Sequence, residues 1–294
     1  MPLAIGWADS VRHELAAAFP YHEGHTVHSF RLREWDPKHR WIEAPLISIS
    51  IVSHGQGKLV CRTLDDLARL PETSRFQVVL TNNVREPLPF AGPDLPYPLK
   101  IIQNTTPKGF GANHNAAFAH CERPFFCVMN PDVRLPQDPF PKLIASMGDP
   151  QAGLLAPLVR NPAGQTEDSA RHFPTPFNLA AKCLGFNDGR VRLIGESPNK
   201  VDWVAGMFML FRADAFRAMG GFDEGFFLYY EDVDICARLW KAGWKIMVHP
   251  AVSIIHDAQR ASHKNPRYLM WHLSSMARYF AKHLGRLPKT PSNL

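Results

Sequence analysis

Short apolar runs alternate with helix-like segments in the first part of the chain after residue 45. Four of these runs are rich in Val, Ile, Leu and Phe and have the length of buried strands: residues 46–52, 76–80, 99–103 and 125–129. Helical periodicity lies between them at residues 59–70 and 111–120. This alternation predicts an α/β fold, with a mostly parallel central sheet and helices on both faces.

Ligands of such a sheet bind beyond the carboxyl ends of its strands, where the loops gather. In this chain those positions are mostly polar: His54, Asn82, residues 104–113 and residues 130–132. The sequence therefore predicts a ligand site along this edge of the sheet.

Three acids, Glu231, Asp232 and Asp234, open a predicted helix that ends before Gly243. Acids in a first helical turn complement the helix dipole, and that structural role alone would explain them. An aromatic run at residues 226–230 comes directly before them, which favours the wall of a pocket over an open surface. A catalytic role and a structural role both remain open here. Two short strands are predicted after the helix, at residues 245–248 and 252–255.

The segment FDEGFFLYYEDVDICARLWKAGWKI, residues 222–246, resembles the signature of inverting family-two glycosyltransferases, in particular their rhamnosyltransferase-like branch. Together with the motifs described below, the resemblance covers roughly residues 45–262. It implies a glycosyltransferase domain of GT-A fold, a nucleotide-diphospho-sugar donor such as dTDP-L-rhamnose, and a glycan or polyprenyl-linked acceptor. In that mechanism Asp232 is the general base for the acceptor hydroxyl, and Glu231 orients the acceptor or Asp232.

The fourth predicted strand ends at Asn130, Pro131 and Asp132. Because Pro131 cannot continue a strand ladder, the chain turns there and points Asp132 outward. A carboxylate at such a turn suits a divalent cation that holds a diphosphate, although an ordinary turn would also explain it. The resemblance implies a metal, Mg²⁺ or Mn²⁺, on Asp132. Asn130 replaces an acid of the family motif, so we expect weak metal binding unless the donor phosphates add ligands.

His256 ends the last predicted strand. The resemblance implies that it is a further metal ligand, and an imidazole would suit Mn²⁺ better than Mg²⁺. A buried histidine bonded to the backbone is the alternative.

The segment KGFGANHN, residues 108–115, resembles the family's Gly-Phe…Asn segment, which contacts the donor. Gly109 and Gly111 would let the backbone approach a ligand, and the start of the following helix favours phosphate. The resemblance therefore assigns Gly109, Phe110 and Asn113 to donor binding, together with Asn130.

The chain departs from the family at two donor positions. Ser53 and His54 stand where Thr-Tyr is usual after the first strand, and Asn82 and Asn83 stand where Asp-Asn is usual after the second. An amide can still recognise uracil or thymine, because it offers both a donor and an acceptor. We assign all four residues to donor binding and leave the base open.

The segment VDWVAG, residues 201–206, resembles the acceptor side of the family's site. It contributes Asp202, Trp203 and Gly206, and residues 171–176 are expected to line the same side. The ring of Trp203 could stack on an acceptor sugar, or it could be a core tryptophan.

The two ends of the chain lie outside the resemblance. Residues 1–44 are predicted to be an accessory extension. Residues 263–294 are predicted to form a basic amphipathic helix, capped by Asn265 and beginning at Pro266. Seven Lys and Arg residues and no acid follow Asp257. This helix could pack on the domain or contact an anionic membrane surface.

Composition narrows the function classes further. No apolar run approaches the roughly 20 residues of a membrane span, and no signal peptide is recognised, which together predict a cytoplasmic protein. The five cysteines are scattered without a CxxC pair, which argues against a zinc site and for reduced thiols. The basic tail without a recognisable module predicts no specific nucleic-acid binding.

Two other functions remain open from the sequence. Sugar-phosphate nucleotidyltransferases have a similar sheet, but their Gly-rich loop usually contains an Arg, which residues 53–58 lack. A non-catalytic glycan-binding or nucleotide-binding module of the same fold would be consistent with the altered donor positions.

Overall fold

The computed structural model describes residues 46–87, 95–186, 189–257, 266–288 and 290. The accessory extension predicted for residues 1–44 lies outside these ranges. Within them, no helix is both long enough and apolar enough to cross a bilayer.

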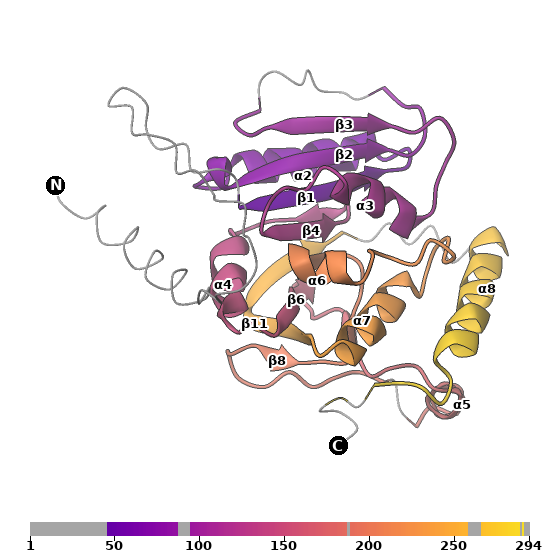
Figure 1. The fold of residues 1–294 in the computed structure, drawn as a ribbon. Coiled ribbons are helices and arrows are strands. Elements are labelled where there is room, and N and C mark those ends of the chain that lie inside the picture. Colours follow the sequence, from indigo (N-terminus) through magenta and orange to yellow (C-terminus); the bar gives the residue numbers. More distant parts are fainter. Residues whose placement is uncertain (1–45, 88–94, 187–188, 258–265, 289, 291–294) are drawn as a thin grey trace, which may run out of the picture.

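The fold is built on a mixed central sheet with the strand order β3-β2-β1-β4-β10-β6-β11-β5 (Figure 1). The strands of its parallel half are β1 (Ile47–Ser53), β2 (Phe76–Asn82), β3 (Leu99–Gln103) and β4 (Phe125–Met129). The other half contains β5 (Val133–Arg134), β6 (Ala152–Arg160), β10 (Phe208–Arg212) and β11 (Lys245–His256), and β8 (Asn199–Lys200) pairs with β11. The predicted α/β fold and its four leading strands are therefore confirmed.

The central strand β1 shows why the sheet has two packed faces. Its sequence ISISIVS places Ile47, Ile49 and Ile51 on one face, and all three are fully buried. Ser48 and Ser50 are buried on the opposite face, where the Ser50 hydroxyl bonds the Nδ1 atom of His114 at 2.8 Å. Apolar packing and one buried polar pair thus fix this strand from both sides.

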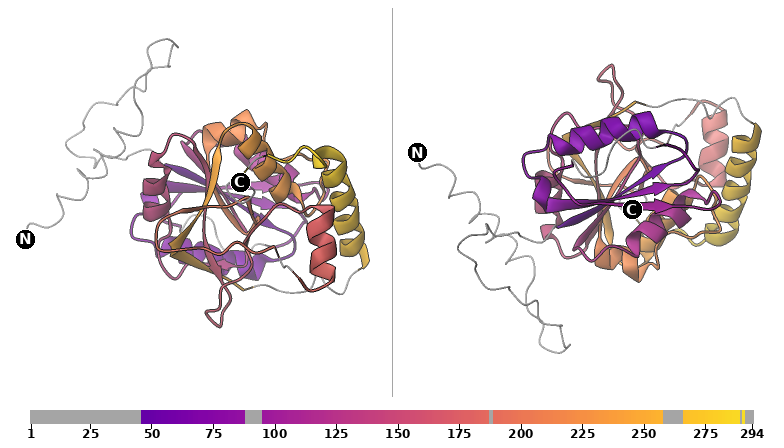
Figure 2. Two further views of the ribbon diagram at one scale, coloured as in Figure 1. Left: turned by 90° about the horizontal axis from the view of Figure 1, so that it is seen from below. Right: turned by 90° about the horizontal axis from the view of Figure 1, so that it is seen from above.

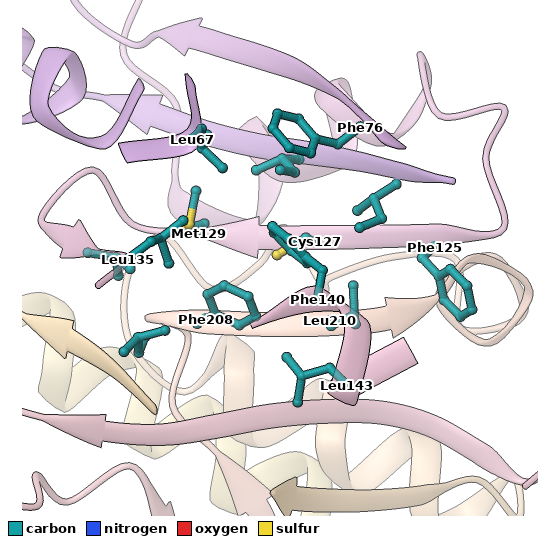
Figure 3. Packing of buried hydrophobic residues seen from close by; sticks show 14 of the residues in the cluster. Leu67, Phe76, Phe125, Cys127, Met129, Leu135, Phe140, Leu143, Phe208 and Leu210 are labelled. Atoms are coloured by element: carbon teal, nitrogen blue, oxygen red, sulfur yellow. The ribbon is translucent and has the colours of Figure 1, made fainter. Parts of the chain in front are cut away.

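Helices cover both faces, as the alternation predicts. The first face carries α2 (Gly57–Ala68) and α4 (Phe140–Ala145), and Figure 3 shows Leu67, Phe140 and Leu143 packed against the sheet. The second face carries α3 (Phe110–Phe118), α6 (Ala213–Ala218) and α7 (Glu231–Lys241). A small sheet pairs β7 (Ala170–Arg171) with β9 (Trp203–Val204).

One strand prediction is wrong in detail. Residues 245–248 and 252–255 were expected as two strands, but they belong to the single strand β11. The register shifts between His249 and Ser253, around Pro250, which has no amide hydrogen for the ladder. A proline-containing irregularity looks like a break in the sequence, whereas the pairing with β6 resumes beyond it.

The last helix, α8 (Pro266–His283), begins at the predicted residue and packs on the domain. Its buried side chains are Ser275, Tyr279 and His283. Figure 2 shows α8 beside α5 (Pro176–Cys183) in both views.

Candidate active site

The two tyrosines directly before helix α7 have an unusual backbone conformation. Tyr229 and Tyr230 have φ angles of 72° and 65°, the left-handed region that bulky residues rarely adopt. The ring of Tyr230 lies 5.3 Å from that of Tyr279 and 5.4 Å from that of His272, both on α8. The Ser275 hydroxyl donates to the carbonyl of Leu228 at 2.9 Å. Helix α8 therefore holds the strained turn from which Glu231 and Asp232 project.

The Asp232 carboxylate is half-buried and held by backbone amides. Its Oδ2 atom accepts a hydrogen bond from the amide of Gly206 at 3.0 Å, and its Oδ1 atom accepts one from Val233 at 2.8 Å. Burial raises the pKa of Asp232 to about 6, against the opposing effect of these amides. The group is thus mostly ionised at neutral pH and able to take up a proton.

Glu231 lies beside it in a drier environment. Its side chain is 4% exposed, and within the described residues its Oε2 atom has no hydrogen-bond partner. Burial, and then the charge of Asp232, raise the pKa of Glu231 well above its usual value. The two neighbouring acids therefore differ in protonation: Glu231 favours the neutral acid, and Asp232 favours the carboxylate.

Asp132 and His256 meet at the ends of β4 and β11. The Nε2 atom of His256 lies 3.4 Å from the Oδ2 atom of Asp132, and its Nδ1 atom lies 2.8 Å from Glu167. The Oδ1 atom of Asp132 is buried and has no partner within the described residues. Burial opposes protonation of His256, but Asp132 and Glu167 outweigh it and raise its pKa. A pocket of about 440 Å³ borders Glu167.

These side chains fit a divalent cation. When neutral, His256 donates its Nδ1 hydrogen to Glu167 and turns the Nε2 lone pair toward Asp132, the arrangement of a ligating histidine with an outer carboxylate. The unpartnered oxygen of Asp132 would be a second ligand atom. No group of three or more His, Cys, Asp and Glu side chains within the described ranges could hold a metal ion. The donor phosphates or water would therefore have to complete the coordination.

A short backbone path joins Asp132 to Asp232. The amide of Asn130 donates to the carbonyl of Met207 at 2.9 Å, where β4 pairs with β10. The neighbouring residue of Met207 is Gly206, whose amide binds Asp232. The pairing of these two strands thus brings the two acids, a hundred residues apart, to the same edge of the sheet.

Asn83 and Asn113 organise the loop that enters α3. The Oδ1 atom of Asn83 accepts from the amide of Lys108 at 2.7 Å and from Asn104 at 2.9 Å. The Nδ2 group of Asn113 donates to the carbonyls of Lys108 and Gly109. The side-chain amides of Asn83 and Asn113 are thus bonded to the loop. Their assignment to donor binding remains a prediction, and they would contribute to it by holding the loop backbone.

Gly109 and Phe110 connect this loop to the acids. A Cβ atom on Gly109 would lie 2.5 Å from the carbonyl oxygen of Phe227, so glycine is needed for that close approach. The ring of Phe110 lies 4.4 Å from that of His114 and covers Gly206, where a Cβ atom would meet it at 3.0 Å. The predicted donor loop therefore packs directly on the residue that binds Asp232.

Glu86 is a residue of this edge that the sequence analysis missed. Its carboxylate accepts hydrogen bonds from the Ser53 hydroxyl and from the amides of Gly55 and Gly57, at the start of α2. It thus occupies a helix terminus that would otherwise attract an anion. Its sequence context is a Pro-rich loop, which gives no sign of this contact.

The other two residues assigned to donor binding, His54 and Asn82, differ in exposure and in hydrogen bonding. His54 is exposed, and its Nδ1 atom lies 3.1 Å from the Nδ2 atom of Asn83. Asn82 is buried, and its Oδ1 atom has no partner within the described ranges. Asn82 therefore has an unused acceptor at the predicted base-binding position.

Two of the predicted acceptor residues support the local structure. Asp202 is 2% exposed and accepts from the amide of Phe173 at 3.0 Å. Trp203 is half-buried, and its indole donates to the carbonyl of His172 at 2.9 Å. These bonds fix residues 171–176 beside β9. Part of the Trp203 ring is exposed, so its stacking on an acceptor sugar remains a prediction. Asp202 would contribute to acceptor binding only by holding the turn.

Comparisons with known proteins agree with this geometry. A model of the family described as "Glycosyltransferase like family 2" matches residues 44–279. Rhamnosyltransferase WbbL of Escherichia coli (strain K12) is 31% identical over 258 residues, which cover 81% of this chain and 93% of that protein. The N-acetylglucosaminyl-diphospho-decaprenol L-rhamnosyltransferase of Mycobacterium tuberculosis (strain ATCC 25618 / H37Rv) is 34% identical over 149 residues, 47% of this chain and 48% of that protein.

Solved structures share the fold at low sequence identity. GalNAc-T7 with UDP, GalNAc and Mn²⁺ has a TM-score of 0.62 and 15% identity, over 81% of this chain and 48% of that one. The mannosyltransferase PcManGT from Pyrobaculum calidifontis, in complex with GDP-Man and Mn²⁺, has a TM-score of 0.59 and 16% identity, over 97% of this chain and 74% of that one. The chain therefore belongs to glycosyltransferase family 2, as a rhamnosyltransferase-like enzyme of GT-A fold.

Proposed function

We propose that the enzyme transfers L-rhamnose from a dTDP-linked donor to a polyprenyl-linked glycan in cell-surface polysaccharide synthesis, with a divalent cation and with inversion at the anomeric carbon. The observation that carries the proposal is the carboxylate of Asp232, which two backbone amides hold at the edge that also carries Asp132 and His256. The names of the Escherichia coli and mycobacterial rhamnosyltransferases support the sugar, and that of the mycobacterial enzyme supports the lipid carrier.

In this mechanism Asp232 removes the proton of an acceptor hydroxyl while its oxygen attacks the anomeric carbon. The new glycosidic bond forms on the face opposite to the breaking bond, so the configuration inverts. General base catalysis of this kind contributes about 10²–10⁴ in rate. Burial raises the pKa of Glu231 and so favours its protonated form, which can donate a hydrogen bond to the acceptor or to Asp232.

On the donor side, Asp132 and the Nε2 atom of His256 would be the metal ligands, and Glu167 orients the imidazole. A cation bound there would neutralise the negative charge of the departing diphosphate. The loop that begins at Lys108 would support the nucleotide, and the free oxygen of Asn82 is the acceptor available to its base.

A test of this function is incubation with a panel of nucleotide sugars and a polyprenyl-diphosphate-linked acceptor, with Mn²⁺ and with chelator. Rhamnosylated lipid formed only from dTDP-L-rhamnose would support the proposal. Release of a nucleoside triphosphate from sugar phosphate, or donor binding without any transfer, would contradict it.

The pH profile is a second test. Because Asp232 must be ionised and its pKa is about 6, kcat/KM is expected to be constant above pH 7 and to fall toward tenfold per unit below about pH 5.5. Donor affinity, measured over the same range by calorimetry, separates this loss from a loss of binding. A kcat/KM value that stays level down to pH 5 would argue against Asp232 as the base.

Replacing Asp132 by Ala is expected to weaken Mn²⁺-dependent donor binding by at least about tenfold, since loss of an outer-shell partner alone costs 10–100-fold in metal affinity. Calorimetric titration of dTDP with and without Mn²⁺ measures this. Asp65→Ala, on the exposed face of α2, is the matched control. Equal affinities for the variant and wild type in Mn²⁺ would remove Asp132 from the donor site.

We further propose that the enzyme acts at the cytoplasmic face of a membrane, because its proposed acceptor is lipid-linked. Contact through the C-terminal helix is part of this proposal.

A further inference from the structure

Within the part of the chain that the structure describes, seven large apolar side chains are exposed on α8 and in the region of α5. Those of the α5 region are Phe177 (81% exposed), Leu184 (72%) and Phe186 (84%), and those of α8 are Leu269 (59%), Met270 (65%), Leu273 (45%) and Leu284 (60%). The two helices appear side by side in both views of Figure 2, and in Figure 1 α5 lies below the lower end of α8. We propose that this α5–α8 surface docks on an anionic lipid bilayer. The inference rests on the proposed function, because it places a lipid-linked acceptor at the site.

The orientation of α8 creates the exposed stripe. Helix α8 packs on the domain through the buried side chains of Ser275, Tyr279 and His283, and through Met276 and Phe280 of its apolar face. Leu269 and Leu273, one turn apart, face outward together with Leu284. Among the described residues, the large apolar side chains at the start of α8 therefore stay exposed, whereas Met276 and Phe280 of the same face contact the core.

The side chains after α5 are presented in a defined turn. The amide of Leu184 donates to the carbonyl of Ala180 at 3.1 Å, and that of Phe186 donates to Ala181 at 3.0 Å. Gly185 between them has a φ angle of 79°, which permits this helix ending. The backbone therefore holds two large apolar residues outward.

The chemistry around the stripe favours lipid over a protein partner. Helix α8 contains no acid, and its exposed Arg267 lies over the ring of Trp271 at 5.4 Å. Tyr268 packs on the same ring, and Arg286 is exposed beyond the helix end. Leucines and aromatic rings flanked by arginines are typical of helices that lie at the interface of anionic membranes.

Part of the positive charge of the helix is used within the fold. Arg278 and Lys282 both form ion pairs with Asp223. Lys282 also bonds Asp234, which is fully buried. Membrane contact would therefore use the exposed apolar side chains and the exposed Arg286, whereas Arg278 and Lys282 hold α8 on the domain.

The α5–α8 surface is coupled to the predicted acceptor side by a short piece of chain. Helix α5 follows residues 171–176 directly, and these are fixed by the bonds from Trp203 to His172 and from Phe173 to Asp202. A bilayer on this surface would thus bring a lipid-linked sugar to the acceptor side of the active site.

The proposal is tested by flotation of the full chain with vesicles of phosphatidylcholine and phosphatidylglycerol, and with vesicles of phosphatidylcholine alone. The variants are F177S/F186S, on α5 and in the turn after it, and L269S/L273S on α8. The matched control is I101S, since Ile101 is 46% exposed on the edge strand β3. We expect wild type and I101S to bind the anionic vesicles, and each double variant to bind at least about tenfold more weakly.

Folding is checked by turnover of a water-soluble acceptor analogue, which the double variants should retain because none of these residues contacts Asp232. Vesicle binding does not depend on transfer, so it can succeed even if the proposed reaction is wrong. Binding by the double variants equal to wild type would overturn the proposal. So would equal binding to both vesicle types, or a dimer in solution that the same variants dissociate without any vesicle binding.

Discussion

Replacing Asp232 by Asn is expected to lower kcat by about 10²–10⁴ and to leave donor affinity nearly unchanged. The amide has almost the shape of the carboxylate, and its oxygen can still accept a hydrogen bond from Gly206 or Val233. It cannot take up the acceptor proton at any accessible pH. Single-turnover transfer, measured beside calorimetric donor binding, separates the two effects.

Glu231→Gln is the informative comparison for this experiment. Because burial favours neutral Glu231, its amide retains a hydrogen-bond donor, and the loss in kcat should be much smaller than for Asp232→Asn. Turnover by Asp232→Asn within a few fold of wild type would assign proton removal to another group. A larger loss of kcat for Glu231→Gln than for Asp232→Asn would make Glu231 the general base and Asp232 the orienting residue.

The fold could be predicted well because its signals are local. Strands β3 and β4 and helix α7 begin and end where the sequence patterns place them. The polar residues after each strand also lie at one edge, since parallel strands end together. These features depend on hydrophobic periodicity and helix signals within about a dozen residues, which a single sequence contains.

The site could be predicted only in part because its remaining features depend on distant contacts. Glu86 reaches the start of α2 from a loop that reads as an ordinary surface segment. The sequence assigns Asn83 to donor binding and gives no sign that its side-chain oxygen accepts from the amide of Lys108 in the loop before α3. Tyr229 and Tyr230 have left-handed backbone angles, which a sequence usually signals with glycine. Here rings of α8, forty or more residues away, stabilise the two tyrosines instead. The spacing of residues along the chain does not reveal side-chain partners of this kind.

The docking of α8 on α7 is the clearest example of such a contact. Asp234 is fully buried in the first turn of α7, where the sequence analysis offered only the helix dipole as its structural role. It accepts from Arg238 at 2.7 Å, from Lys282 at 2.7 Å and from His283 at 2.8 Å. The Nδ1 atom of His283 faces the ammonium group of Lys241 at 2.9 Å. Since ammonium can only donate, Nδ1 accepts and the Nε2 hydrogen points to Asp234.

Replacing Asp234 by Ala is therefore expected to lower the free energy of unfolding by about 3–5 kcal/mol, because removal of one partner leaves buried charges uncompensated. Asp214→Ala is the matched control, since the side chain of Asp214 is 80% exposed in its pair with Arg217, and its change should stay within about 0.5 kcal/mol. Urea unfolding at pH 7 measures both variants. A loss for Asp234→Ala as small as that of the control would show that α8 is held by its apolar contacts alone.

The same cluster determines how the stability difference between wild type and Asp234→Ala changes with pH. Burial alone would raise the pKa of Asp234, but the bond from His283 and the charges of Arg238 and Lys282 outweigh it and lower the pKa to about 2. A carboxyl with a depressed folded-state pKa stabilises the fold above its ordinary value of 3.8 and loses that effect as the pH falls through about 2. The gap between wild type and Asp234→Ala should therefore narrow below about pH 4. A gap that widens in acid would mean that Asp234 is already protonated in the folded enzyme, and that its three basic neighbours do not act on it as a cluster.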